Sequence, residues 1–512
     1  MINGKKQDVN TGEQSSQVTI MMHGEKLFLS GLIALIALCS GLNTPIYWVA
    51  IPEIKKHFDI TEEQANLTIT AYLVFQAVSP MLVCTFSDIW GRRPIILYCM
   101  LASLGSNLGL VFCPSYGVMI FLRCLLAAHA APLIAISSAV VGDFTTRIDR
   151  GGYVGFTFGF TLIGSGLAPF IGACLDQRWK WRGIFAFAAI LNAISLTLAH
   201  PIVGNMSILP RHFIHKSPII YIRGRKRICG LEANTTKKYK FNIKEIVTTM
   251  KLLKDPLVIF ALVPNSLIYA TWTMSQATMS LSLSDSYHYV PIKVGLCFLA
   301  PGIACCISAI LCGKLLNHGY KKQHDSRQIT EEETDTSNEP KEIPDAQTKD
   351  LTVDPENSPN NHQPNIIRAR LRYFQPFNLG VVISSILYEA TNPPIHQSTN
   401  PPIHQSTNPP IHQSTNPPIH QPATNTLLVD LHPENSGAVS SLNNLFRCGL
   451  GSIFVSCLTK MNGSLTIGGT YTLMAGICTI SSLCLPFVLR QSDSIIRKSP
   501  ERYTDNKATQ NV

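Results

Sequence analysis

The feature that most constrains this chain is a series of long segments without a charged residue. A helix needs about 20 predominantly apolar residues to cross the hydrocarbon core of a bilayer. Because lipid offers no partner for an unpaired backbone group, we expect these segments to form membrane-spanning α-helices. The segments are Leu27–Ala50, Gln64–Phe86, Pro94–Leu122, Cys124–Gly142, Gly151–Leu175, Gly183–Pro210, Pro256–Ser284, Val294–Gly313 and Met461–Leu489.

Two predicted helices each contain one arginine. Pro114 and Ser115 divide one long segment, so that Tyr116–Gly142 forms its own helix with Arg123 inside it. A further helix, Asn435–Thr459, is interrupted only by Arg447. A charge within the membrane is costly, faces the protein interior and is functional by default. We therefore expect Arg123 and Arg447 to be functional intramembrane charges.

Composition excludes several classes of protein. Of the 512 residues, 46% are apolar and 14% are charged, whereas soluble domains have about 25% charged residues. This composition excludes a disordered chain and disfavours a soluble enzyme. The net charge of +10 is not on a compact domain, so no nucleic-acid partner is expected. The 15 cysteines are scattered and are interpreted as reduced packing residues.

Basic residues predict the orientation in the membrane. Gly204–Lys254 contains twelve Lys and Arg residues, which places this linker in the cytoplasm by the positive-inside rule. Counting back six helices places the N-terminus in the cytoplasm as well. The predicted organisation is an N-terminal tail 1–26, a six-helix half 27–203, the basic linker 204–255, a second half 256–489 and a cytoplasmic C-terminal tail 490–512.

The second half is interrupted by a repeat. From Asn392 to Gln421 the octapeptide Asn-Pro-Pro-Ile-His-Gln-Ser-Thr recurs in four copies, and proline pairs at this spacing prevent a helix. The number of helices in the chain stays open between ten, eleven and twelve. Within this half we expect helices 7–8 at 256–313, a polar arm at 314–372, a degenerate helix 9 at 373–389, the repeat at 391–421 and helices 11–12 at 435–489.

A charged motif stands between the second and third helices. Asp88, Gly91, Arg92 and Arg93 meet at a predicted membrane boundary. This order resembles the loop 2–3 signature of the major facilitator superfamily, although Cys84 and Ile89 replace a glycine and an arginine of that signature. The resemblance implies that Asp88 locks one conformation by docking near the start of helix 11.

A second motif lies in the fifth helix. Gly155, Gly164, Pro169 and Gly172 stand at the spacing of the superfamily's antiporter motif, with alanine replacing two of its glycines. Small residues let helices approach closely. The resemblance implies an exporter.

Longer strings, including Ser-Gly-Leu-Asn-Thr-Pro-Ile-Tyr-Trp-Val-Ala-Ile-Pro at 40–52, resemble the fungal 12-helix drug:proton antiporters, in the subgroup that exports quinidine-type drugs and polyamines. The resemblance implies an all-α membrane fold of two six-helix halves, with helices 9–10 disrupted here. It also implies a monomer without cofactors that exchanges protons for a drug or a small organic cation across a lipid bilayer. The plasma membrane is the expected location, with the vacuolar membrane as the alternative.

Polar residues inside the predicted helices are candidates for the substrate pathway. These are Asn43, Asn265 and Asn444, beside the two arginines. Asp143 and Arg147 at the cytoplasmic end of helix 4 are expected to act as a gate. No metal site is expected. Two alternatives stay open, namely a transport-inactive degenerate paralogue and a membrane sensor.

Overall fold

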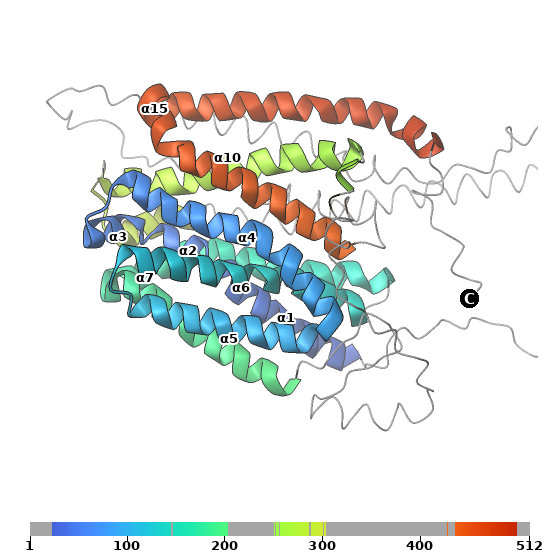
Figure 1. Ribbon diagram of the computed structural model, residues 1–512, viewed down its shortest axis with the longest axis horizontal. Helices are drawn as coiled ribbons and strands as arrows, with labels where there is room; N and C mark the ends of the chain where they lie inside the picture. The colour runs from blue at the N-terminus through green and yellow to red at the C-terminus, as the bar shows by residue number, and fades with distance from the viewer. Residues whose placement is uncertain are drawn as a thin grey trace, which may run out of the picture.

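The computed structural model describes residues 23–144, 147–202, 250, 252–254, 256–285, 288–300, 302–303, 428 and 436–498. All regular structure in these ranges is helical (Figure 1). The elements are α1 His23–Leu42, α2 Pro45–Trp48, α3 Ile51–Phe58, α4 Glu62–Trp90, α5 Arg92–Val111, α6 Tyr116–Phe144, α7 Arg147–Ile202, η1 Leu252–Lys254, α10 Pro256–Asp285 and α15 Ser436–Lys498. A short apolar helix, Pro291–Ala300, follows α10.

Two of the elements are helical hairpins. The helix α7 breaks at Lys180, whose φ is 55°, and α15 breaks at Thr466, whose φ is 65°. Figure 1 shows α15 folding back on itself at this break. The residues of α1 to α7 (the first half) therefore provide six long helical limbs, as the sequence predicts. The described residues from 250 onward are the second half.

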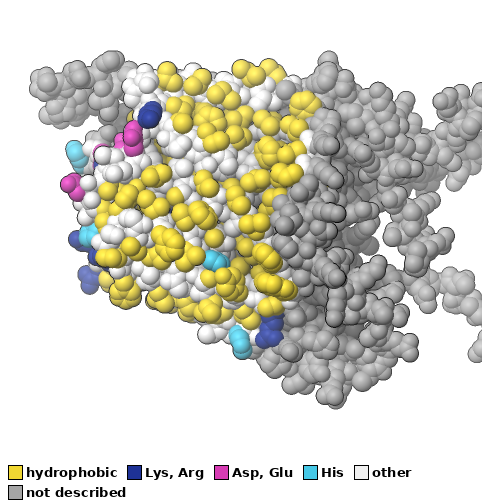
Figure 2. Space-filling view, in the orientation of Figure 1, with side chains coloured by type: hydrophobic (Ala, Val, Ile, Leu, Met, Phe, Trp, Pro, Cys, Tyr) yellow, Lys and Arg dark blue, Asp and Glu magenta, His cyan; other side chains and the backbone are white. Residues whose placement is uncertain are grey.

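Six described segments are long and apolar enough to cross a membrane. One of them, Gly155–His200, contains the break at Lys180. Large apolar side chains on these helices are exposed, among them Phe112, Phe121 and Ile480. In Figure 2 apolar side chains are spread over the whole described face, and most of the charged side chains gather along its left edge. This surface is suited to lipid and makes the chain an integral membrane protein.

Local sequence explains where several helices begin and end. Thr61 and Gln64 form a capping box at the start of α4, in which Thr61 N–H donates to Gln64 Oε1 at 2.9 Å. Gly91 separates α4 from α5 with a φ of 92°, a conformation that side chains disfavour. Pro114 and Ser115 lie between α5 and α6, where the sequence predicts a break.

Two boundaries differ from the sequence prediction. The first span is not one helix, because new helices begin at Pro45 and near Pro52, and proline lacks the N–H that a continuing helix requires. The last helix continues through Lys498 rather than ending at Leu489. Helical hydrogen bonds form within the segment, so a helix can extend beyond its apolar part. The arm 314–372, helix 9, the repeat and most of the basic linker lie outside the described residues.

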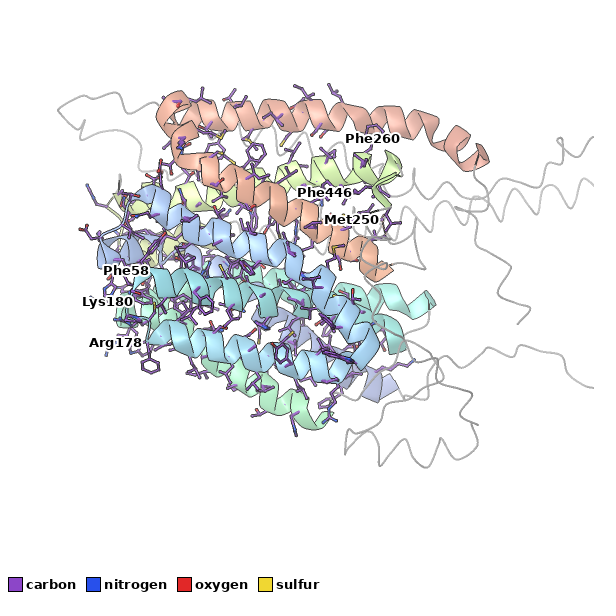
Figure 3. All side chains as sticks on the ribbon, viewed as in Figure 1. Phe58, Arg178, Lys180, Met250, Phe260 and Phe446 are labelled. Atoms are coloured by element: carbon purple, nitrogen blue, oxygen red, sulfur yellow. The ribbon has the colours of Figure 1, made fainter. Side chains whose placement is uncertain are left out.

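The largest cluster of buried apolar side chains joins the two halves, and a small cluster of Ala77, Tyr269 and Cys448 also joins them. The largest cluster contains Trp48 and Tyr72 from the first half and Met274, Phe298 and Tyr471 from the second. We call the end of the bundle at which this cluster lies the Lys180 end. Phe58, Arg178 and Lys180 lie there in Figure 3, whereas Met250 and Phe260 lie away from it.

Two further large clusters each belong to one half. One is built from α1, α5, α6 and α7, with Ile33, Ile96 and Leu133 among its members. The other is built from α10 and α15 with Leu428, and includes Leu262 and Leu442. Among the described residues, each half thus has an apolar core of its own in addition to the shared clusters.

Candidate functional site

The most deeply buried charge in the described structure is Arg123 of α6. Its side chain is 1% exposed. Its guanidinium carbon lies 3.6 Å from the centre of the Tyr47 ring and 4.4 Å from that of Tyr72. The Tyr47 hydroxyl is in turn hydrogen-bonded to Thr68 at 2.7 Å. Helices α2 and α4 therefore present two aromatic faces to a cation carried by α6.

No described carboxylate neutralises Arg123. The ion pairs among the described side chains join Lys55 with Asp285 and Lys180 with Glu53. Nε and Nη1 of Arg123 also lack a hydrogen-bond partner within the described part of the chain. The aromatic faces stabilise the charge, and a cation over a desolvated ring contributes about 2 kcal/mol. The site consequently retains unused N–H donors.

Arg447 of α15 has a related arrangement in the second half. Its guanidinium carbon lies 4.6 Å from the centre of the Tyr269 ring, and one of its amino groups donates to Asn444 Oδ1 at 2.7 Å. Asn444 Nδ2 donates to the carbonyl oxygen of Gln76 in α4 at 2.6 Å. Asn444 therefore connects the second arginine to the first half.

The other two predicted pathway residues have local partners. Asn265 Nδ2 donates to Asn443 Oδ1 at 3.1 Å, a contact between α10 and α15 within the second half. Asn43 Nδ2 donates to the carbonyl oxygen of Cys39, one turn earlier. The structure thus brings Asn444 to an arginine, whereas the hydrogen bonds of Asn43 and Asn265 stay within their own halves.

The loop 2–3 residues form a compact turn. Arg92 is buried and donates to Ser87 Oγ at 2.7 Å. Arg93 donates to the carbonyl oxygen of His200 at 2.7 Å and so ties α5 to the end of α7. Asp88 lies in the last turn of α4, but its side chain is outside the described structure, as are those of Asp143 and Arg147. The expected docking of Asp88 and the expected gate stay predictions.

The glycine-rich motif of α7 packs against α1 and α2. A Cβ at Gly164 would stand 3.1 Å from the carbonyl oxygen of Leu38, and one at Gly172 would stand 2.8 Å from that of Ile46. A Cβ at Gly155 would meet nothing within 4 Å. Gly164 and Gly172 are therefore required for close helix packing, whereas Gly155 is not.

The α7 motif region also reaches the second half. The carbonyl oxygen of Pro169 lies 3.4 Å from the position of a Cβ at Gly295, in the helix Pro291–Ala300. Pro169 thus lies at the contact between the two halves.

Sequence reasoning missed the three tyrosines that accompany the arginines. Tyr47, Tyr72 and Tyr269 are all buried. A hydroxyl-bearing aromatic residue inside an apolar helix is a signal that could have indicated them, because a buried tyrosine hydroxyl usually requires a partner. Their pairing with Arg123 and Arg447 depends on helix rotation, which the spacing alone does not determine.

Comparison with known proteins gives the family. The model of the Major Facilitator Superfamily matches residues 33–324. The chain is 32% identical over 492 residues to the multidrug transporter AQR1 of Candida glabrata, covering 94% of this chain and 78% of that protein. It is 33% identical over 484 residues to quinidine resistance protein 1 of Saccharomyces cerevisiae, covering 92% and 84% respectively.

A third relative is the MFS antiporter QDR1 of Candida albicans. The chain is 32% identical to it over 493 residues, which cover 93% of this chain and 90% of that protein. The family match covers more than half of the chain and includes α2 to α7, in which the Arg123 site and the glycine motif lie. The chain belongs to the major facilitator superfamily of membrane transport proteins.

Proposed function

We propose that this chain exports small organic molecules, drugs among them, by alternating access coupled to proton antiport. The observation that carries the proposal is the division of the apolar core. The largest cluster joins the halves at the Lys180 end, a small one of Ala77, Tyr269 and Cys448 also joins them, and each half has a large cluster of its own. Two bodies that each have an apolar core of their own can rock about a central site, as transporters of this kind do.

The Lys180 end faces outward if the N-terminus lies in the cytoplasm, as the basic linker predicts. Polar contacts between the halves hold this end together. Asn66 of α4 donates to Thr459 of α15 at 3.0 Å, and Ser280 of α10 donates to the carbonyl oxygen of Trp48. With this orientation the described conformation has its outer side closed, and the proposed export requires these contacts to break.

The proposed substrate class rests on the names of the relatives and on the resemblance of the motifs. The names of the relatives, multidrug transporter and quinidine resistance protein, support drugs as substrates, and the resemblance of the motifs extends this to polyamine-like organic cations. Proton antiport is supported by the relative named as an antiporter. The membrane is proposed to be the plasma membrane, with the vacuolar membrane as the alternative.

The arginines favour a second candidate, the export of organic anions. Arg123 and Arg447 place two cations among the spanning helices, and the described ion pairs involve neither of them. Two unused donors on Arg123 could bind a carboxylate, whereas a cationic substrate would be repelled there. The charge of the substrate therefore separates the two candidates.

The test is efflux from a fungal strain that lacks its own drug exporters. Cells are loaded with labelled quinidine, spermidine or benzoate, and wild type is compared with Arg123→Ala. Arg178→Ala removes an exposed arginine at the Lys180 end and is the matched control. Energy-dependent efflux that is lost only in Arg123→Ala supports export, and the label that moves identifies the charge class. No efflux from correctly located protein favours the inactive paralogue or the sensor.

A further inference from the structure

Asp176 is a buried carboxyl group that the proposed transport cycle has not used so far. It follows the charge-free segment Gly151–Leu175 and precedes the break of α7 at Lys180, so it lies at the outer margin, beyond the membrane-spanning segment. Asp176 is only 4% exposed. Its Oδ1 atom has no hydrogen-bond partner in the described part of the chain. A buried carboxylate without a partner is unfavourable, which indicates a special role or a neutral form.

Asp176 follows the part of α7 that packs against the second half. Gly166 approaches Gly302 so closely that a Cβ on Gly166 would stand 2.8 Å from the Gly302 carbonyl oxygen. Two turns farther out, Ala173 approaches Gly295. Residues three and four apart are neighbours on a helix surface. Asp176 therefore lies one turn beyond both Ala173, which faces the second half, and Gly172, which faces Ile46 of α2.

The charged groups that act on Asp176 belong to the first half. Glu53 of α3 and Lys180 of α7 interact with Asp176, and Lys180 Nζ lies 3.9 Å from Glu53 Oε1. In the second half, Lys293 lies in the first turn of the helix Pro291–Ala300, and its ammonium group is 5.7 Å from the centre of the Tyr289 ring. Burial, and then the negative charge of Glu53, raise the pKa of Asp176 from 3.8 to about 7, against a lowering effect of Lys180.

We propose that Asp176 is the proton-responsive residue of the outer gate, and that its protonation by the outside medium stabilises the closed contact between the two halves. The inference rests on the proposed alternating access. When the halves are in contact at the Lys180 end, the carboxyl group is buried and is held as the neutral acid. When they separate, water reaches the group and it ionises, releasing its proton to the outside.

The direction of the pH dependence follows from linkage. The pKa of Asp176 is higher in the closed state than in the open one, so the closed state binds more protons. The stabilisation is fully present below the open-state pKa, near the ordinary value of 3.8, and is lost as pH rises through about 7. Between these values the closed-to-open ratio falls with rising pH, by at most about tenfold per pH unit for one proton.

The test measures the separation of the outer ends directly. Two genetically encoded azido amino acids replace the exposed residues Trp179 and Leu465, one on each half, and carry a fluorophore pair that leaves the cysteines untouched. Single-molecule energy transfer is recorded for the full chain in lipid nanodiscs from pH 4.5 to 8.5. Wild type is compared with Asp176→Asn, a permanently neutral isostere, and with Glu53→Gln.

The expected result is a closed population that falls with rising pH in wild type and stays high in Asp176→Asn. Glu53→Gln removes the adjacent negative charge and shifts the midpoint to lower pH without abolishing the transition. An Asp176→Asn profile that matches wild type overturns the proposal. A wild-type distance that responds to drug but not to pH overturns it while leaving alternating access intact. A distance that responds neither to drug nor to pH contradicts both the role of Asp176 and alternating access.

Discussion

The guanidinium carbon of Arg123 lies 3.6 Å from the centre of the Tyr47 ring, although 76 positions separate the two residues in the sequence. This contact places a cation inside the membrane bundle without a described carboxylate beside it. The second half contains a related pair, in which Arg447 lies over Tyr269 at 4.6 Å. Each half of the transporter thus uses an aromatic ring to hold an intramembrane arginine.

The Tyr47 ring, rather than its hydroxyl group, is predicted to hold Arg123. Tyr47→Leu removes the aromatic face and is expected to reduce efflux by at least about tenfold, since a desolvated cation–π contact contributes about 2 kcal/mol. Tyr47→Phe keeps the face and loses only the hydrogen bond to Thr68, so its efflux should fall by less than about threefold. Initial efflux rates at equal surface expression give the comparison, and equal losses in both variants would contradict this role of the ring.

The ion pair between Lys55 and Asp285 is predicted to help close the outer gate. The two side chains lie 2.8 Å apart across the halves and are 30% and 42% exposed, so the pair contributes at most about 1 kcal/mol. Lys55→Ala should raise the population with separated outer ends by up to about fivefold. Single-molecule energy transfer between fluorophores at positions 179 and 465 measures this population.

The exchanged pair, Lys55→Asp with Asp285→Lys, provides the control for this prediction. It restores an attraction of the same kind and should return the open population toward the wild-type value. If the exchanged pair opens the gate as much as Lys55→Ala does, the salt bridge is not the cause.

The close approach of α7 to α2 at Gly172 is predicted to be needed for stability. A methyl group there would stand 2.8 Å from the carbonyl oxygen of Ile46, and overpacking of this kind costs about 1–3 kcal/mol. Gly172→Ala should therefore lower the melting temperature in detergent. Gly155→Ala alters the same motif where a Cβ meets nothing within 4 Å, and should leave that temperature unchanged or raise it slightly. A similar decrease in both variants would count against the packing role.

The Asn444 side chain is predicted to couple Arg447 to α4. Asn444→Leu leaves an Arg447 N–H and the Gln76 carbonyl without their partners, which costs about 1–3 kcal/mol for each buried group. Efflux and melting temperature should both fall. Asn444→Asp keeps the acceptor for Arg447 and loses only the donor to Gln76, so it should retain more of both. If efflux and melting temperature fall equally in the two variants, the contact of Asn444 with Arg447 does not determine them.

The sequence predicts the helices well because a helix that crosses lipid needs about 20 predominantly apolar residues. Charge-free length indicates the spans, and the turn at Lys180 lies where Arg178, Lys180 and Arg182 interrupt the apolar sequence. The extension of α15 to Lys498 could not be predicted in this way, since a helix that leaves the lipid no longer needs apolar residues.

The site is predicted less completely, because contacts between helices depend on rotation and tilt. Arg123 and Arg447 can be recognised individually, as charges in apolar segments are rare. Their aromatic partners come from other helices, and no local pattern connects Tyr72 to Arg123. Asp176 borders an apolar segment, and no local sequence pattern predicts that its side chain is buried.

Transport by the purified chain tests the central claim most directly. Liposomes containing the protein are given an acidic interior, and entry of labelled quinidine is compared with entry into protein-free liposomes. The account predicts proton-driven accumulation above the protein-free level for wild type and for Arg178→Ala, and its loss in Arg123→Ala. Accumulation no greater than in protein-free liposomes, with benzoate and spermidine also failing to move, would contradict the assignment of this chain as an exporter.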